Sequence, residues 1–406
     1  MTPSARLSAA ITVLDAILAG QTAEGALTAW GRASRFAGSG DRHAVRDLVF
    51  DALRCKRSFA AQGGGMTGRG LILGGLRAGG ADVAAIEALF NGQGHAPHGI
   101  GPADEARRPV AGEAMDLPDW LLPELARSVA DVGQFAAALI ARAPVFLRVN
   151  RAKTTLLALQ TELAAHGVQT QLVPYLQDAL QVVDGARKLS ATNALQHGLA
   201  ELQDAASQSI VAAISLPKSG RILDFCAGGG GKTLNIAAQL SDSKSVILQA
   251  YDALPRRMID LPARAARANA AVQILQTLPD FSDFGTKTNG YDLILTDVPC
   301  SGSGSWRRDP MGKWALTAQK LDEVLALQAR ILDQAAAMVS PSGQLAYSTC
   351  SVLNCENEDQ IASFLQRNSR FKCRKMQRFG LGNLAQDTTG GDGFFLAIMN
   401  RISTNG

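Results

Sequence analysis

Apolar residues recur at helical spacing through the first part of the chain, from residue 9 to about residue 59. One such stripe is formed by Ala10, Val13, Leu14, Ile17 and Leu18. A Gly- and Pro-rich stretch at 91–109 then marks a connection, and helical periodicity resumes over 120–141. Because a period near 3.6 residues is typical of amphipathic helices, this region is predicted to be all-helical.

The pattern changes at Val145. Residues 146–150 predict a strand, 156–166 a helix and 169–173 a second strand, which together favour a small α+β module. After about Ile222, short apolar runs alternate with helical segments, and such alternation predicts a parallel, doubly wound α/β sheet. Its buried strands are expected at 222–225, 246–251, 272–275, 291–296 and 344–347. The tail over 371–401 favours a further pair of strands.

A chain of 406 residues is too long for one ordinary hydrophobic core. We therefore expect a helical domain at 1–135, a small α+β linking module at 143–205 and the doubly wound domain at 206–406. Apolar residues make up 47% of the chain, yet no uninterrupted apolar run is long enough to cross a bilayer. The start of the chain lacks the pattern of a secretory signal, and the six cysteines have no framework spacing, so we expect a cytoplasmic protein without a membrane partner.

A glycine turn follows the first buried strand of the doubly wound region. Asp224 and Phe225 run directly into a loop composed of Cys226, Ala227, Gly228, Gly229, Gly230, Gly231 and Lys232. A strand, a glycine turn and a helix start together favour a cofactor site at the carboxyl edge of a sheet. A phosphate loop would need glycine where Cys226 stands, and a nicotinamide fingerprint starting at Gly228 would need its last glycine where Thr233 stands, so both are disfavoured.

The second strand of this region ends at Asp252, whose carboxylate is placed to accept hydrogen bonds from ribose hydroxyls. An adenosine cofactor is therefore compatible with the loop and the strand end together. The alternative is that Asp252 only caps the helix that starts near Pro255.

Two cysteines follow strand ends at the same expected edge, Cys300 after Asp297 and Cys350 after Thr349. A lone buried cysteine is usually a small hydrophobic residue, but two at corresponding positions favour chemistry. A zinc site would need a close cysteine or histidine partner, which neither has, so no metal is expected. A thiol beside a methyl donor suits alkylation of a pyrimidine, because addition to carbon 6 activates carbon 5, with Asp297 as partner for ring nitrogen 3. Which cysteine attacks stays open on these grounds.

Three motifs resemble those of the RNA cytosine-5 methyltransferases of the Nop/Sun group, especially the bacterial 16S ribosomal-RNA methyltransferase B type. They are the glycine loop from Asp224 to Lys232, the Asp-x-Pro-Cys-Ser-Gly-x-Gly motif at 297–304, and Thr349-Cys350-Ser351 followed by Glu356-Asn357-Glu358. The resemblance implies a Rossmann-like class I methyltransferase fold. It also implies that Cys350 is the nucleophile, that Cys300 assists release, and that S-adenosylmethionine is bound by the glycine loop, Asp252 with Arg257, and Asp297.

The chain departs from the family pattern at several positions. Gly228 and Gly229 replace Ala and Pro in the loop, no acidic residue stands near Gln276 on the third strand, and Met311 stands in the Arg-x-Pro-Asp-x-x-Trp pattern. Upstream, 146–150 and 203–208 resemble the family's linking module. The helical region, with its Asp-Arg and Leu-Arg pairs at 41–42 and 53–54, resembles its NusB-like RNA-binding domain.

This upstream likeness favours 16S ribosomal RNA as substrate, with tRNA methylation and a catalytically silent RNA-binding assembly factor as alternatives. The net charge of +4 is compatible with a polyanionic partner but does not select one. The side chains expected to guide an RNA backbone are Arg148, Arg307, Arg308 and Lys313, the alternative being ordinary solvated cations.

Overall fold

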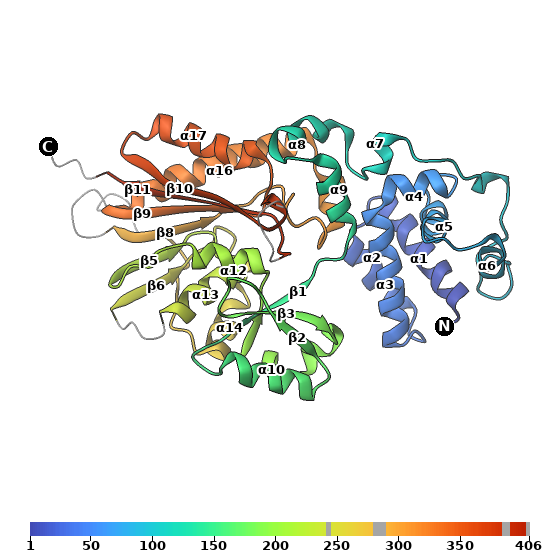
Figure 1. The fold of residues 1–406 in the computed structure, drawn as a ribbon, viewed down its shortest axis with the longest axis horizontal. Coiled ribbons are helices and arrows are strands. Elements are labelled where there is room, and N and C mark those ends of the chain that lie inside the picture. Colours follow the sequence, from blue (N-terminus) through green and yellow to red (C-terminus); the bar gives the residue numbers. More distant parts are fainter. Residues whose placement is uncertain (241–244, 279–289, 384–389, 403–406) are drawn as a thin grey trace. The chain divides into compact units, whose positions relative to one another are not determined.

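The computed structural model describes residues 1–240, 245–278, 290–383 and 390–402. The chain divides into two compact units (Figure 1). The first contains 1–123, 131–142 and 306–315, and the second contains 124–130, 143–305 and 316–406. Within the described ranges, no helix combines the length and the apolar character that crossing a bilayer would require. The expected domain boundaries at 135, 143 and 205 stay predictions.

The first unit is helical, as the sequence pattern predicts. Apolar faces of its first helices pack around Leu14, Val45, Val49, Leu53 and Leu71, all of which are buried. Its elements are α1 (Pro3–Leu18), α2 (Ala23–Ala33), α3 (Ser39–Arg54), α4 (Lys56–Gln62), α5 (Gly68–Ala78), α6 (Val83–Leu89), η1 (Pro102–Asp104), α7 (Ala111–Ala114), η2 (Asp119–Leu121), α9 (Val132–Ile140) and α15 (Pro310–Ala315). Most of α8 (Leu122–Ser128) belongs to the second unit.

Residues 306–315, which follow the second cysteine-containing motif in the sequence, pack inside this helical unit. Lys313 Nζ donates to the Arg54 carbonyl at 2.7 Å, and Trp314 Nε1 donates to the Leu53 carbonyl at 2.8 Å. Met311 packs against the helical core. The substituted position in the Arg-x-Pro-Asp-x-x-Trp pattern is thus occupied by an apolar packing residue.

The second unit begins with the predicted α+β module. Its sheet has the order β2-β3-β1-β4, with β1 (Val145–Val149), β2 (Gln169–Leu172), β3 (Ala179–Asp184) and β4 (Ala200–Leu202). One face is covered by α10 (Leu156–Ala165), through Leu159 and Leu163, and the connection between β3 and β4 contains η3 (Ala186–Ala191) and α11 (Asn193–Gln196). The predicted strands β1 and β2 and the helix between them are confirmed, whereas β3 and β4 were not predicted.

The large sheet of the second unit has seven strands in the order β10-β11-β9-β8-β5-β6-β7. From β7 to β9 all neighbouring pairs are parallel, whereas β11 is antiparallel to both β9 and β10. The strands are β5 (Gly220–Asp224), β6 (Val246–Ala250), β7 (Gln273–Ile274), β8 (Tyr291–Asp297), β9 (Val339–Thr349), β10 (Phe371–Phe379) and β11 (Phe394–Arg401). This arrangement confirms the doubly wound α/β sheet and the pair of strands at the C-terminal end.

Helices cover both faces of this sheet (Figure 1). On one face α16 (Ala318–Met338) and α17 (Glu358–Arg367) pack over Leu223, Ile294 and Leu345, and on the other α12 (Ala205–Ala212) and α13 (Gly231–Gln239) pack over Ile222 and Leu293. Neighbouring residues of one strand thus point to opposite faces, as the period of a strand requires. The remaining helices are η4 (Pro255–Met258), α14 (Leu261–Ala268), η6 (Asn354–Glu356) and η7 (Gly380–Asn383).

Asn150, at the end of β1, joins the small module to the large sheet. Its buried amide donates to the Gly198 carbonyl at 3.0 Å and to the Ala268 carbonyl at the end of α14 at 2.8 Å. We predict that Asn150→Ala lowers the free energy of unfolding by about 1–3 kcal/mol, because two buried carbonyls lose their donor. Urea denaturation followed by circular dichroism measures the loss. Leu157→Ala, on the exposed surface of α10, is the control, and an equal effect of both substitutions would contradict the prediction.

Candidate active site

The carboxyl ends of three adjacent parallel strands define the site. β5 ends at Asp224, β8 ends at Asp297, and β9 ends at Thr349, directly before Cys350. β5 and β8 are neighbours in the sheet although β6 and β7 lie between them in the sequence. Ligands of doubly wound sheets bind at such a reversal of strand order, outside the carboxyl ends of the strands.

The two cysteines predicted at strand ends meet in the structure. Their sulfur atoms lie 3.3 Å apart, within hydrogen-bonding distance. The register of β8 against β9 pairs Asp297 with Ser348, so both chains leave the sheet at the same level. The backbone keeps them together as well, because the Gly304 N–H donates to the Cys350 carbonyl at 3.0 Å. The spacing of the two cysteines in the sequence does not by itself predict this contact between their sulfur atoms.

The two thiols are not equivalent. The hydrogen bond between the two thiols lowers the pKa of Cys350, against the effect of burial. The same hydrogen bond, together with burial, raises the pKa of Cys300. Nearby charges act on both thiols, since Asp297 raises and Lys232 lowers the pKa of Cys350, whereas Glu356 raises the pKa of Cys300. Because a thiolate is the reactive form of cysteine, this difference is compatible with the prediction that Cys350 is the nucleophile, which stays a prediction.

Asp297 is held from two sides at the end of β8. Its Oδ2 accepts from Lys232 Nζ at 2.7 Å, and its Oδ1 accepts from the Ser348 hydroxyl at 2.8 Å. Lys232 is buried and also lies 4.8 Å from the centre of the Phe394 ring. The side chain of Asp297 remains 31% exposed, so this carboxylate is fixed in direction and still accessible to a ligand.

The glycine loop connects β5 to α13 and leaves open space beside it. Gly230, the N-cap of α13, has φ of +82°, and a Cβ there would meet Leu261 at 2.2 Å, so glycine is required. A Cβ on Gly231 would meet nothing within 4 Å. The start of α13 has no side-chain cap, which leaves its first N–H groups for an anionic ligand group.

Asp252, just after β6, binds this loop directly. Its Oδ2 accepts from the Gly228 N–H at 3.0 Å and its Oδ1 accepts from the Leu254 N–H at 2.9 Å. Arg257 forms an ion pair with the same carboxylate at 3.3 Å, and its guanidinium lies near Gly228. Asp252 therefore closes a turn before η4 and holds the loop, but it does not cap η4, whose N-cap is Leu254 with no side-chain cap bond, so the alternative interpretation was wrong. The predicted contact with ribose hydroxyls stays a prediction.

The site offers three features to a ligand: open space beside α13, uncapped N–H groups at the start of α13, and the carboxylates of Asp252 and Asp297. They suit a ligand that carries a carboxylate, hydroxyls and a positive centre. S-adenosylmethionine has these groups, so the residues present fit the predicted donor.

The thiol of Cys226 lies in the loop, and burial raises its pKa well above the ordinary value, which makes it unreactive. Within the described part of the chain, no group of His, Cys, Asp and Glu side chains is arranged to hold a metal ion.

Asp224 is the first residue of the glycine motif, and it was not predicted as a site residue. Its Oδ2 accepts from the Thr233 hydroxyl at 2.6 Å, and its Oδ1 is buried without a hydrogen-bond partner. Burial raises the pKa of Asp224 to about 7. Ser348, whose hydroxyl donates to Asp297, was not predicted either, because a serine in a strand carries no signal of its own. The position of Asp224 directly before a glycine turn was the available signal.

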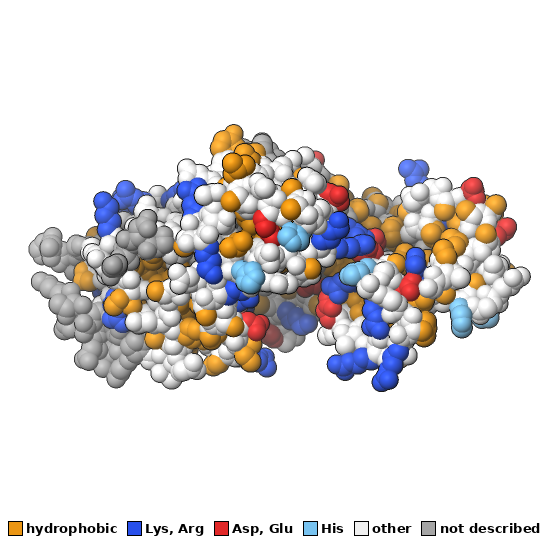
Figure 2. Space-filling view, turned by 90° about the horizontal axis from the view of Figure 1, so that it is seen from below, with side chains coloured by type: hydrophobic (Ala, Val, Ile, Leu, Met, Phe, Trp, Pro, Cys, Tyr) orange, Lys and Arg blue, Asp and Glu red, His pale blue; other side chains and the backbone are white. Residues whose placement is uncertain are grey.

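The expectation for the cationic side chains was largely wrong. Arg148, Arg307 and Lys313 are each at most 5% exposed, so they are neither surface guides for a phosphate backbone nor ordinary solvated cations. Arg148 Nε donates to Gln203 at 2.7 Å, and burial lowers the pKa of Lys313 to about 8. On the face shown in Figure 2, Lys and Arg side chains stand in several separate groups with Asp and Glu among them. Arg308 alone of the four is exposed.

The strand order, with its antiparallel β11, and the cofactor-type glycine loop define a Rossmann-like methyltransferase. The model of one family, described as 16S rRNA methyltransferase RsmB/F, matches residues 211–400, and that of the RsmF/B-like ferredoxin-like domain matches 117–187. Ribosomal RNA small subunit methyltransferase B of Xanthomonas campestris is 32% identical over 307 residues, which span 73% of this chain and 69% of that relative. The chain therefore belongs to the RsmB/F methyltransferase family.

Other similar proteins agree with this assignment. Ribosomal RNA small subunit methyltransferase B of Erwinia tasmaniensis is 32% identical over 284 residues, spanning 69% of this chain and 65% of the relative. Among solved structures, PH0851 covers 99% of both chains with a TM-score of 0.73 at 18% identity. NSun6 from Pyrococcus horikoshii, solved with SFG, covers 70% of this chain and 98% of its own with a TM-score of 0.58 at 18% identity. These structural similarities support the fold.

The thiol pair predicts a pH dependence of alkylation. Since the hydrogen bond with Cys300 is the largest influence that lowers the pKa of Cys350, Cys300→Ala should raise that pKa. The pH of half-maximal alkylation of Cys350 by iodoacetamide should therefore move upward, as measured by peptide mass spectrometry across a pH series. Cys373→Ala, distant in sequence on β10, is the control. An unchanged or lowered midpoint in Cys300→Ala would contradict this assignment of the two thiols.

Proposed function

We propose that the protein transfers a methyl group from S-adenosylmethionine to carbon 5 of a cytosine in RNA, with 16S ribosomal RNA as the substrate. The observation that carries the proposal is the hydrogen-bonded pair of Cys300 and Cys350 beside Asp297 at the edge of a methyltransferase sheet. The choice of RNA is supported by the family description and by the names of the relatives from Xanthomonas and Erwinia.

The opposite pKa shifts of the two thiols support a different role for each cysteine. Carbon 5 of cytosine is a weak nucleophile, and it becomes enamine-like when a thiolate adds to carbon 6. Cys350, whose pKa is lowered by the hydrogen bond from Cys300, is the thiol that forms the bond to carbon 6. Asp297, fixed by Lys232 and Ser348, is the proposed partner for ring nitrogen 3, where charge develops.

The later steps return the enzyme to its starting state. The bound donor supplies an electrophilic methyl group, and the electron pair at carbon 5 forms the new carbon–carbon bond. Water then takes up the carbon 5 proton, and the electron pair of that C–H bond re-forms the ring double bond and breaks the bond between carbon 6 and Cys350, which leaves as a thiolate. Cys300, whose sulfur lies 3.3 Å from the Cys350 sulfur, is proposed to assist this release by hydrogen bonding to the departing thiolate.

Donor binding is proposed to depend on Asp252, which fixes the glycine loop through Gly228. Asp252→Asn replaces one acceptor oxygen by an NH₂ group that faces a backbone N–H. We predict that the affinity for S-adenosylmethionine falls at least about tenfold, as expected when a hydrogen bond to a charged group is lost. Isothermal titration calorimetry measures the affinity. Asp260→Asn, on an exposed residue before α14, is the matched control, and equal affinities of the two variants would reject this role.

The proposed reaction is tested with tritiated S-adenosylmethionine, unmodified 16S RNA and, separately, total tRNA. We predict label in 5-methylcytosine of 16S RNA, loss of label by more than about a thousandfold in Cys350→Ala, and a covalent RNA–protein adduct that accumulates in Cys300→Ala. Label in tRNA alone would reject 16S RNA as the substrate. No label in either RNA, with measurable donor binding, would reject catalysis and favour an RNA-binding assembly factor.

A further inference from the structure

The loops that carry the two cysteines converge on one buried carboxylate, that of Glu356. Its Oε1 accepts from the Ser301 N–H at 2.7 Å, and its Oε2 accepts from the hydroxyls of both Ser301 and Ser351. Ser301 directly follows Cys300, and Ser351 directly follows Cys350. A single side chain, 0% exposed, is therefore bonded to the neighbour of each thiol.

Gln328, on α16, fixes the other side of Cys300. Its buried amide donates both to Glu356 Oε1 at 3.0 Å and to the Pro299 carbonyl at 2.9 Å. The residues before and after Cys300 are thus held by Gln328 and Glu356, which are also bonded to each other. This arrangement leaves the Cys300 loop little freedom to move independently of Glu356.

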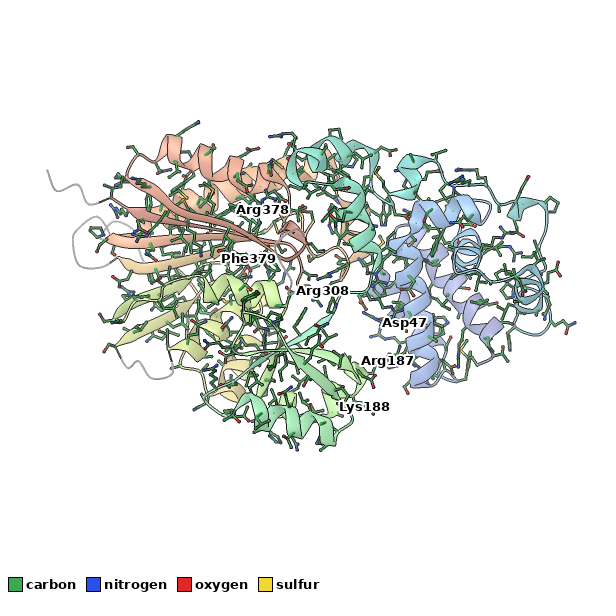
Figure 3. The ribbon with its side chains drawn as sticks, in the orientation of Figure 1. Asp47, Arg187, Lys188, Arg308, Arg378 and Phe379 are labelled. Carbon is green, nitrogen blue, oxygen red and sulfur yellow. The ribbon has the colours of Figure 1, made fainter. Side chains whose placement is uncertain are left out.

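Asn357 plays the corresponding part for Cys350. Its Oδ1 accepts from the Thr349 hydroxyl at 2.6 Å, and its Nδ2 donates to the Ser351 carbonyl at 2.9 Å. Both flanking residues of Cys350 are thus bonded to one side chain, which is 0% exposed. Arg378 on β10, labelled in Figure 3, donates to the Val352 carbonyl at 2.7 Å and to the Glu358 carboxylate, which braces the same loop from outside.

The surroundings of Glu356 are unusual for a carboxylate. Within the residues that the structure describes, its contacts are hydroxyl, amide and backbone N–H donors, and no lysine or arginine forms an ion pair with it. Burying a carboxylate without a cation is costly, and the cost is offset only when every donor is in place. The network is therefore demanding in geometry, and displacing one loop would break bonds to the other.

We propose that Glu356 is a positioning residue, which, with Gln328 and Asn357, sets the separation of the Cys300 and Cys350 sulfur atoms. The inference rests on the proposed function, in which one thiol attacks and the other assists release. Because one carboxylate holds both loops, the two thiols stay within hydrogen-bonding distance while substrate enters and leaves. Loss of the Glu356 carboxylate therefore impairs both the attack on the cytosine ring and the release of the product. Cys300→Ala, in contrast, impairs the release most.

The test measures the pH dependence of Cys350 alkylation in RNA-free protein. Glu356→Ala removes every acceptor, whereas Glu356→Gln keeps one carbonyl oxygen for Ser301 N–H and loses the acceptor shared by the two hydroxyls. We expect the midpoint pH for alkylation of Cys350 by iodoacetamide to rise by about one unit or more in Glu356→Ala and by less in Glu356→Gln, because Cys300 no longer donates reliably. Glu323→Gln, on an exposed residue of α16, is the matched control and should keep the wild-type midpoint.

A wild-type midpoint in both Glu356 variants would overturn the proposal. If Glu356→Ala does not fold, as judged by circular dichroism, Glu356→Gln alone decides it, and a wild-type midpoint there assigns the carboxylate to folding only. Since the measurement uses no RNA, it is independent of the proposed function. A wild-type protein that methylates no RNA would reject the function and leave the thiol result valid, whereas normal methylation with unshifted midpoints would reject the positioning role alone.

Discussion

The pairing of β8 with β9 is the constraint on which the site depends. These strands are parallel neighbours, and Asp297 is level with Ser348, so two loops that are far apart in the sequence leave the sheet side by side. The consequence is a hydrogen bond between Cys300 and Cys350, which makes one sulfur an acceptor and the other a donor. Without that register the cysteines would be two ordinary small apolar residues, and neither would have a distinct role.

The rest of the site organises charge around this pair. Lys232 joins the glycine loop to Asp297 through an ion pair. The loop is the proposed donor site and Asp297 is the proposed partner of the cytosine ring, so this ion pair links the two parts of the site. Asp252 fixes the same loop through Gly228, which is useful where two glycines replace the stiffer Ala-Pro pair of related sequences. Glu356 then ties the two cysteine loops to each other. Each connection uses a buried polar group, Lys232, Asp252 or Glu356, whose cost of burial is offset by its hydrogen bonds.

Much of this architecture was predictable, because strand and helix periodicity depends on which face of an element is buried. The order of elements from β5 to β11, the glycine turn and the placing of Cys300 and Cys350 at strand ends all followed from local patterns. The burial of Arg148 and Lys313 could not be predicted from local patterns, because burial of a cation depends on partners distant in the sequence, such as Gln203 and the Arg54 carbonyl. β3 was missed because its apolar residues do not alternate with polar ones, and β4 because it spans three residues; pairing with β1 defines both strands.

The central claim is that Cys350, and not Cys300, bonds to the cytosine ring. The most direct test uses 16S RNA containing 5-fluorocytidine, in which fluorine replaces the proton that must leave, so that the covalent complex persists in the presence of S-adenosylmethionine. Mass spectrometry of the trapped protein then identifies the modified peptide. The account predicts a ribonucleotide on Cys350, with Cys300 unmodified. A ribonucleotide on Cys300, or methyl transfer to normal RNA without any trapped complex, would contradict it.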